Sequence, residues 1–139
     1  MAKQSALFLP AGANNQSVLL TSADTTVAKL CFTAGTNDSD VKSIIATTTD
    51  SAAVNLTFWV TRGGTDYLLG TVNIPITAGD TGAIPSVDIL GAGLIPGLPL
   101  DSTGKPYLPL KTGDTLKVGC LVTMTAAKTT YVSIFGQDY

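Results

Sequence analysis

Residues 52–74 constrain the fold most, because they read as a β-hairpin from end to end. In the first half, apolar residues alternate with more polar ones, and a period of two places one set on each face of a strand. Gly63 and Gly64 follow, and adjacent glycines supply the positive φ that a tight reversal between right-twisted strands needs. The core set is Val54, Leu56, Phe58 and Val60, and the opposite set is Asn55, Thr57, Trp59 and Thr61.

The second half of this hairpin resumes the alternation with Leu68, Val72 and Ile74 as its core residues. Gly70 stands at the matching position between them, where it predicts a β-bulge or a close backbone approach. On the opposite face, Trp59 is the only tryptophan in the chain. It indicates either a surface meant for a partner or a face covered by a second packed sheet.

Period-two patterns recur along the rest of the chain, with Gly12 to Asn15 predicted as a turn. They predict short strands at residues 5–10, 17–20, 25–33, 41–49, 84–90, 116–124 and 129–135. Eight to ten short strands at spacings of about ten residues are typical of a β-sandwich or a small barrel. We therefore expect an all-β fold, an antiparallel β-sandwich with jelly-roll-like order. It forms a single domain over residues 1–139, with an N-terminal arm at residues 1–15.

The same alternation predicts which side chains share a face in three of these strands. The expected sets are Leu30 with Phe32 against Lys29 with Cys31; Leu116, Val118, Cys120, Val122 and Met124 together; and Val132 with Ile134 against Tyr131, Ser133 and Phe135. In the last strand both sets are bulky enough that we expect both faces to be covered.

The residues on which most enzymes depend are missing. The chain has no histidine and no glutamate, so an acid/base pair would have to come from ten aspartates, most of them in turns. No nucleophile elbow, phosphate-binding glycine loop or metal-ligand spacing is present. Cys31 and Cys120 lack metal spacing and are expected as small buried hydrophobes, with a pairing between them left open. The sequence predicts no catalytic activity, no cofactor and no metal.

Charge is sparse along the chain. Charged residues make up 13% and the mean hydropathy is +0.33, so a lone monomer would expose an adhesive surface. No apolar run approaches the eighteen residues of a membrane span, and seven lysines spread singly form no basic stripe for phosphates. We therefore expect no contact with a membrane and no direct contact with nucleic acid. We expect the apolar surface to be buried against other subunits. This composition indicates an assembly protein.

Three segments supply candidate docking residues. Residues 91–109 form a long loop rich in proline, glycine and large apolar side chains, which can keep a fixed shape at small entropic cost. The alternative is that this loop caps its own end of the sandwich. The candidates are Leu94, Ile95, Leu98, Leu100 and Tyr107 in the loop, Trp59 in the hairpin, and Leu7, Phe8 and Leu9 in the arm.

Several short runs carry a resemblance to known proteins. They are residues 65–72 (TDYLLGTV), 99–101 (PLD), 106–110 (PYLPL) and the turn at residues 113–115 (GDT). In these runs and in its low-charge, threonine-rich character, the chain resembles small virion proteins of tailed bacteriophages. It is most similar to the jelly-roll cement, or decoration, proteins on the outside of the head.

The resemblance implies a structural virion protein, made in the host cytoplasm and located on the capsid exterior. It implies a homodimer or homotrimer that binds across neighbouring subunits of the major capsid protein and braces the shell. No catalytic residue is carried over. The alternatives are a phage tail or fibre protein, or a lectin-like receptor-binding module in which Trp59 and Tyr67 stack on a sugar.

Overall fold

The computed structural model describes residues 12–139, which form nine β-strands and one short 3₁₀ helix, η2 (Ser22–Asp24). No α-helix occurs in this part of the chain. The strands are β1 (Gly12–Thr21), β2 (Lys29–Thr33), β3 (Ser39–Thr48), β4 (Val54–Arg62), β5 (Thr65–Ile74), β6 (Val87–Asp88), β7 (Leu108–Leu110), β8 (Thr115–Cys120) and β9 (Thr129–Asp138).

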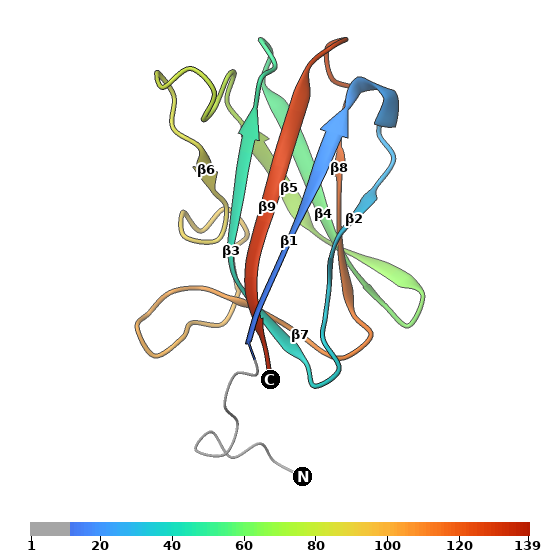
Figure 1. Ribbon diagram of the computed structural model, residues 1–139, viewed down its shortest axis with the longest axis vertical. Coiled ribbons are helices and arrows are strands. Elements are labelled where there is room, and N and C mark those ends of the chain that lie inside the picture. The colour runs from blue at the N-terminus through green and yellow to red at the C-terminus, as the bar shows by residue number, and fades with distance from the viewer. Residues whose placement is uncertain (1–11) are drawn as a thin grey trace.

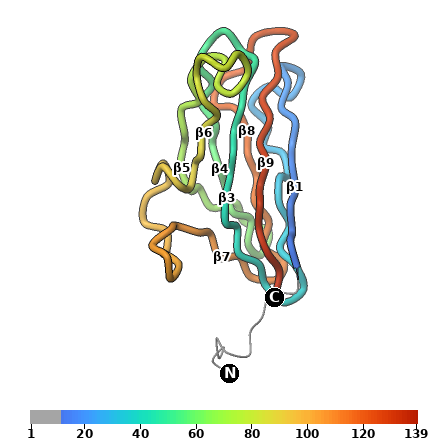
Figure 2. Tube along the Cα trace, turned by 60° about the vertical axis from the view of Figure 1, so that its left-hand side comes forward, coloured from blue at the N-terminus to red at the C-terminus, as the bar shows by residue number. Residues whose placement is uncertain are grey.

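Two antiparallel sheets face each other and enclose one core (Figures 1 and 2). The five-stranded sheet has the order β1-β9-β3-β6, with β7 also paired to β3, and the four-stranded sheet has the order β2-β8-β4-β5. The pairing is nested: β1 meets β9, β2 meets β8, β3 meets β6 and β7, and β4 meets β5. A chain that doubles back as one long hairpin and then rolls up gives this order, which is the jelly roll. The expected β-sandwich is confirmed.

The central hairpin forms as predicted. Gly63 and Gly64 have φ values of 58° and 80° and connect β4 to β5. The register shifts where Phe58 faces Gly70 and Trp59 faces Leu68, so a bulge lies in β5 as expected. The extra residue, Leu69, reverses the faces to which the side chains between the bulge and the turn point. Leu68, predicted for the core, is therefore 65% exposed, and Leu69 packs against the core in its place.

A second bulge corrects the predicted faces of β2. The register between β2 and β8 shifts between Leu30 and Phe32. Because of this shift Cys31 and Phe32 are both buried, although they are adjacent, and Leu30 is exposed. The strict alternation that placed Leu30 with Phe32 was wrong, since a bulge turns two neighbouring side chains to one side.

Three other segments differ from the sequence prediction. β1 begins at Gly12, so the turn predicted at residues 12–15 is wrong, and its pairing with β9 is continuous to Thr21. β8 ends at Cys120, and Val122 is exposed instead of continuing the core set. The predicted strand at residues 84–90 shrinks to β6, although Ile89 and Leu90 after it are buried.

Threonine hydroxyls connect the ends of β3 and β9. Thr130 Oγ1 donates to Thr48 Oγ1 at 2.9 Å, and both residues are fully buried. The N–H of Thr129 donates to Thr49 Oγ1, and the N–H of Thr49 donates to the carbonyl of Thr129. Threonine combines a β-branched shape that suits a strand with a hydroxyl that can satisfy such a buried site. This network gives one physical reason for the high threonine content.

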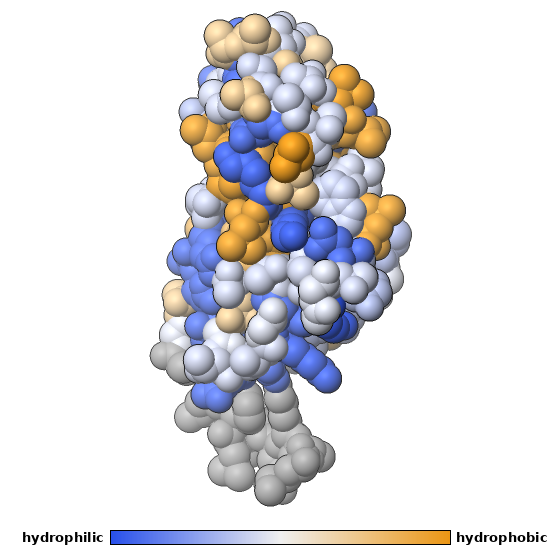
Figure 3. Space-filling model, turned by 90° about the vertical axis from the view of Figure 1, so that its right-hand side faces the viewer, coloured by the Kyte–Doolittle hydropathy of each residue, from blue (hydrophilic) through white to orange (hydrophobic). Residues whose placement is uncertain are grey.

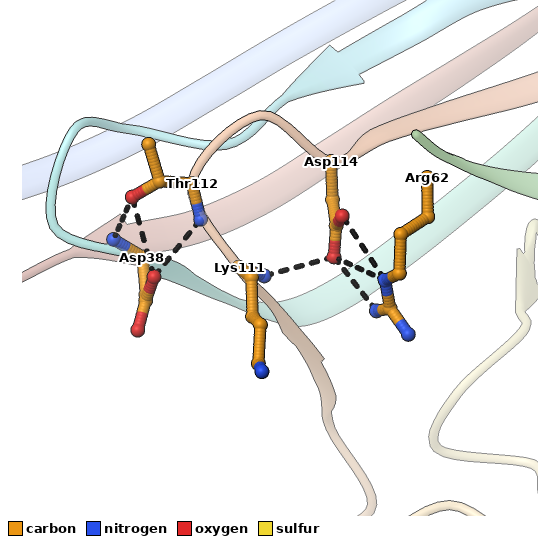
Figure 4. Close-up of polar contacts among 5 residues, drawn as sticks. All are labelled: Asp38, Arg62, Lys111, Thr112 and Asp114. Carbon is orange, nitrogen blue, oxygen red and sulfur yellow. Dashed lines mark hydrogen bonds and ion pairs between the residues drawn. The ribbon is translucent and has the colours of Figure 1, made fainter. Parts of the chain in front are cut away.

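The turn before β8 is held by an ion pair to the only arginine in the chain (Figure 4). Asp114 is 3% exposed and accepts hydrogen bonds from Arg62 Nη2 at 2.7 Å, from Arg62 Nε and from the N–H of Lys111. The hydrogen bonds from Arg62 hold the pKa of the Asp114 carboxyl below its usual value. The same turn also contacts the β2–β3 loop, where Asp38 Oδ1 accepts a hydrogen bond from the N–H of Thr112.

Candidate functional site

On the outer face of the five-stranded sheet, nine side chains from β1, β9 and β3 form a grid of three rows, with one residue from each strand in every row. The registers of β1, β9 and β3 place the members in rows, and directly opposite residues share a face. We call this grid the β1–β9–β3 face. Its rows are Leu19, Tyr131 and Thr47; Ser17, Ser133 and Ile45; and Asn15, Phe135 and Ser43. Figure 1 looks directly onto it.

None of these nine side chains carries a charge, and three large apolar ones are open to solvent. Leu19 is 43% exposed, Tyr131 48% and Phe135 45%. Charged residues border the face. Asp88 of β6 pairs with Ile45, and Asp40 and Lys42 lie near the start of β3. An uncharged surface with exposed apolar side chains and a charged rim is similar to the usual anatomy of a protein interface. The face can therefore bury its side chains without stranding an ion.

The outer face of the four-stranded sheet differs because cross-strand pairs occupy its polar groups. Lys117 Nζ lies 3.3 Å from Asp66 Oδ1, Asn73 donates to Asn55 Oδ1, and the hydroxyls of Thr57 and Thr71 lie 2.9 Å apart. Trp59 is half-buried among them. It lines a shallow hollow of about 420 Å³ together with Thr26, Thr57, Thr71, Leu68, Leu121 and Cys120.

The loop predicted as a docking segment is partly folded into the molecule. Ile95 is 4% exposed and belongs to the core, and Leu98 packs against the core at half-burial, whereas Leu94 and Leu100 are exposed. Tyr107 is half-buried, with Lys42 Nζ 4.8 Å from its ring centroid. The loop therefore covers part of its own sandwich, and Ile95 is a core residue instead of a surface one. Within the loop, Leu94 and Leu100 remain exposed.

The predicted docking residues do not come together on one face. Trp59 lies on the four-stranded sheet, while the loop accompanies β6 and β7, which pair with β3 of the five-stranded sheet. Leu7, Phe8 and Leu9 lie outside the described residues. Tyr67 faces Val60, which is buried, so Tyr67 and Trp59 lie on opposite faces of the hairpin. The expected pair of aromatic rings around one sugar does not form.

Sequence reasoning missed Leu19, Tyr131 and Phe135 as surface residues. The signal was present in β9, where the alternation separated Tyr131 and Phe135 from the core residues Val132 and Ile134. Both sets were expected to be covered. No other element among residues 12–139 covers the first set, so Tyr131 and Phe135 stay exposed.

Both cysteines lie in the core of the described residues. Cys31 and Cys120 are free and buried, and burial raises the pKa of both thiols. No group of three or more cysteine or aspartate side chains in the described chain is placed to hold a metal ion. Over the same residues there is no helix with the length and apolarity required to span a membrane.

Comparisons with protein-family models, with curated proteins and with solved structures return no match for this chain.

Proposed function

We propose that this protein is a structural virion protein that decorates the outside of a tailed-phage capsid and stabilises it by binding across major capsid protein subunits. The observation that carries the proposal is the uncharged β1–β9–β3 face with its exposed Leu19, Tyr131 and Phe135. The jelly roll is an architecture of viral capsid and lectin domains, and it agrees with the resemblance in the sequence.

The β1–β9–β3 face is large enough for the centre of an interface but not for a whole one. At strand spacings of about 4.8 Å and rises of about 3.4 Å per residue, the grid covers roughly 10 by 14 Å. A stable interface buries about 800 Å² on each partner, so surrounding residues must also make contact. Binding to two or more capsid subunits at once would convert modest individual contacts into strong overall attachment.

Replacement of Tyr131 and Phe135 by aspartate tests the docking face. The double variant places two charges at the centre of the interface, so we expect at least 30-fold weaker binding to capsids, equal to about 2 kcal/mol. The control is Leu68→Asp with Leu121→Asp, which puts the same charges on exposed apolar residues in the four-stranded sheet and directly after β8. Binding is measured by co-sedimentation with particles of the encoding phage that lack the protein.

The two double variants together separate the alternatives. We expect the control to bind like the wild type. Equal binding by both would remove the β1–β9–β3 face from the docking site, and loss in the control alone would assign docking to the four-stranded sheet. A third variant, Leu94→Ser with Leu100→Ser, measures the share of the loop without disturbing the buried Ile95.

A second candidate function, receptor binding by a tail or fibre protein, is favoured by the hollow beside Trp59. Three threonines border this half-buried indole, and an aromatic ring with hydroxyl neighbours suits the apolar and polar sides of a sugar. If this function holds, Trp59→Ala should abolish binding to host surface glycans while the variant stays folded. A glycan array with wild type and variant measures it, and no bound glycan would reject this candidate.

A further inference from the structure

We propose that two copies of this chain associate through the free edge of β1, so that their five-stranded sheets join into one continuous sheet. The proposal concerns self-association and does not depend on whether the other partner is a capsid. It rests on a comparison of the sheet edges and on the directions of the backbone groups along β1.

β1 is the least protected of the long edges in the described structure. Its ten residues contain no charged side chain and no proline, and its register with β9 has no bulge. Such an edge is a template for another strand, and monomeric proteins usually interrupt it with charges, prolines or bulges. Figure 3 looks onto the side with β1 and β2, where hydrophobic side chains lie in separate patches among hydrophilic ones.

The neighbouring edge, β2, is blocked by side chains from β1. The N–H of Thr33 donates to Gln16 Oε1, and the carbonyl of Thr33 accepts from Gln16 Nε2 and Asn14 Nδ2 at 3.1 and 3.2 Å. β2 is also only five residues long and carries a bulge. These bonds close the open side of the sandwich between the two sheets, and they leave the outward edge of β1 free.

The remaining edges are interrupted as well. β5 is ten residues long, but the bulge beside Gly70 breaks it and Asp66 lies near its start. β6 has two residues, and β7 has three with Pro109 at its centre. β1 therefore differs from every other edge strand that the structure describes.

The hydrogen bonds of β9 determine which groups of β1 point outward. Thr129 exchanges backbone and side-chain bonds with Thr49, so its N–H and C=O face β3, and alternate β9 residues do the same. Their partners on β1 are Ala13, Asn15, Ser17, Leu19 and Thr21, whose N–H and C=O groups must face the free edge.

The upper part of this edge is capped and the lower part is open. The carbonyl of Leu19 accepts from Lys29 Nζ at 2.8 Å, and the N–H of Thr21 donates to Asp24 Oδ2 at 2.8 Å. Ala13, Asn15 and Ser17 have no such caps among the described residues. A second strand therefore has space to pair from Ala13 to Ser17 and not beyond.

A two-fold axis at Asn15 fits the open stretch from Ala13 to Ser17. It pairs Asn15 with Asn15 of the second copy and Ala13 with Ser17, and it forms about six backbone hydrogen bonds. A two-fold contact brings each residue near its own copy, so an uncharged strand avoids like-charge repulsion. The joined sheet would carry both β1–β9–β3 faces on one side and double the uncharged surface.

Substitutions at Asn15 test the pairing. Asn15→Pro removes an outward N–H at the axis but leaves the bonds to β9 intact, so we expect a folded monomer. Asn15→Ala keeps the backbone donor and should remain a dimer like the wild type. Sedimentation velocity at about 100 µM protein measures the mass of each, and circular dichroism checks the fold.

Cross-linking provides a second readout that does not depend on the proline variant folding. Opposite residues at the axis have Cα atoms about 5.5 Å apart, within reach of a disulfide, so Asn15→Cys should cross-link two chains on mild oxidation. Ser17→Cys, whose two copies would lie four positions apart, should not, and the native cysteines are buried. A monomeric wild type, a dimeric Asn15→Pro variant or equal cross-linking at both positions would overturn the proposal.

Discussion

The outer faces of the two sheets differ in how their polar side chains are paired. Each must present strand residues away from the shared core, but the four-stranded sheet pairs its polar groups across strands, as Lys117 with Asp66 and Asn73 with Asn55. Within the β1–β9–β3 face of the five-stranded sheet, the one such side-chain contact is weak, between the hydroxyls of Ser17 and Ser133 at 3.3 Å. Around it, large apolar side chains stay exposed.

Both outer faces expose large apolar side chains, such as Leu68 and Leu30 on the four-stranded sheet, so the difference lies in whether the polar groups between them are paired within the chain. Pairs of opposite charges and amides keep the four-stranded face compatible with water and add a little stability. The β1–β9–β3 face gains nothing comparable, and its exposed aromatic rings favour contact with another surface. We therefore propose the five-stranded sheet as the side on which a partner would bind.

The largest expected effect comes from adjacent residues of β9 that point to opposite sides. Ile134 is fully buried, so Ile134→Ala should lower the free energy of unfolding by about 2–5 kcal/mol. Phe135→Ser, one position later on the exposed face, should change it by less than about 0.5 kcal/mol. Urea unfolding followed by tryptophan fluorescence measures both, and a large loss in Phe135→Ser would mean that this face supports the fold instead of being free for a partner.

An intermediate effect is expected at the buried carboxylate that ties β4 to the turn before β8. Asp114→Ala removes the acceptor for Arg62 and for the N–H of Lys111, and a lost hydrogen-bonded partner of this kind costs about 1–3 kcal/mol. The loss is measured at neutral pH by the same unfolding assay. A variant as stable as the wild type would show that the four-stranded sheet does not need this connection.

The same carboxylate predicts a pH dependence. Because the folded pKa of Asp114 is lowered, its contribution is fully present above the unfolded value near 3.8 and is lost as pH falls through the lower folded value. The wild type should therefore lose more stability than Asp114→Asn between about pH 5 and pH 2. Parallel pH profiles for the two proteins would exclude this contribution.

The smallest effect is expected from the exposed pair of Lys117 and Asp66. The pKa of Asp66 is lowered by its hydrogen bond to Thr61 and by Lys117, but water and salt screen such a surface pair. Asp66→Asn should shift the unfolding midpoint slightly at low salt and not at all at about 1 M salt. A shift that persists in high salt would show that the four-stranded face is held by more than these charges.

The hairpin at residues 52–74 and the two-sheet architecture could be predicted because both depend on local patterns. Alternation, paired glycines and a glycine at the bulge position act within a few residues. The bulges limited how well the face of each side chain could be predicted. Leu68 and Leu30 were assigned to the wrong face because one extra residue reverses every side chain up to the next turn.

The candidate site was less predictable, since exposure is a tertiary property. Ile95 and Leu94 are neighbours of similar hydrophobicity in the same loop, yet one is in the core and the other is exposed. Tyr131 and Phe135 alternate in the same way as core residues, and only the absence of a covering element in the described structure marks them as surface residues. The order of the strands, and with it the free edge of β1, depends on long-range pairing that no local pattern contains.

The number of copies in the virus particle tests the central claim most directly. Virus particles purified from the source of the chain would be analysed by quantitative mass spectrometry, and the amount of this chain would be compared with that of the major capsid protein. A protein that binds across the whole shell should be present at a ratio near one or a simple fraction of it. A handful of copies would indicate a tail or fibre component, and absence from the particles would contradict the proposed function altogether.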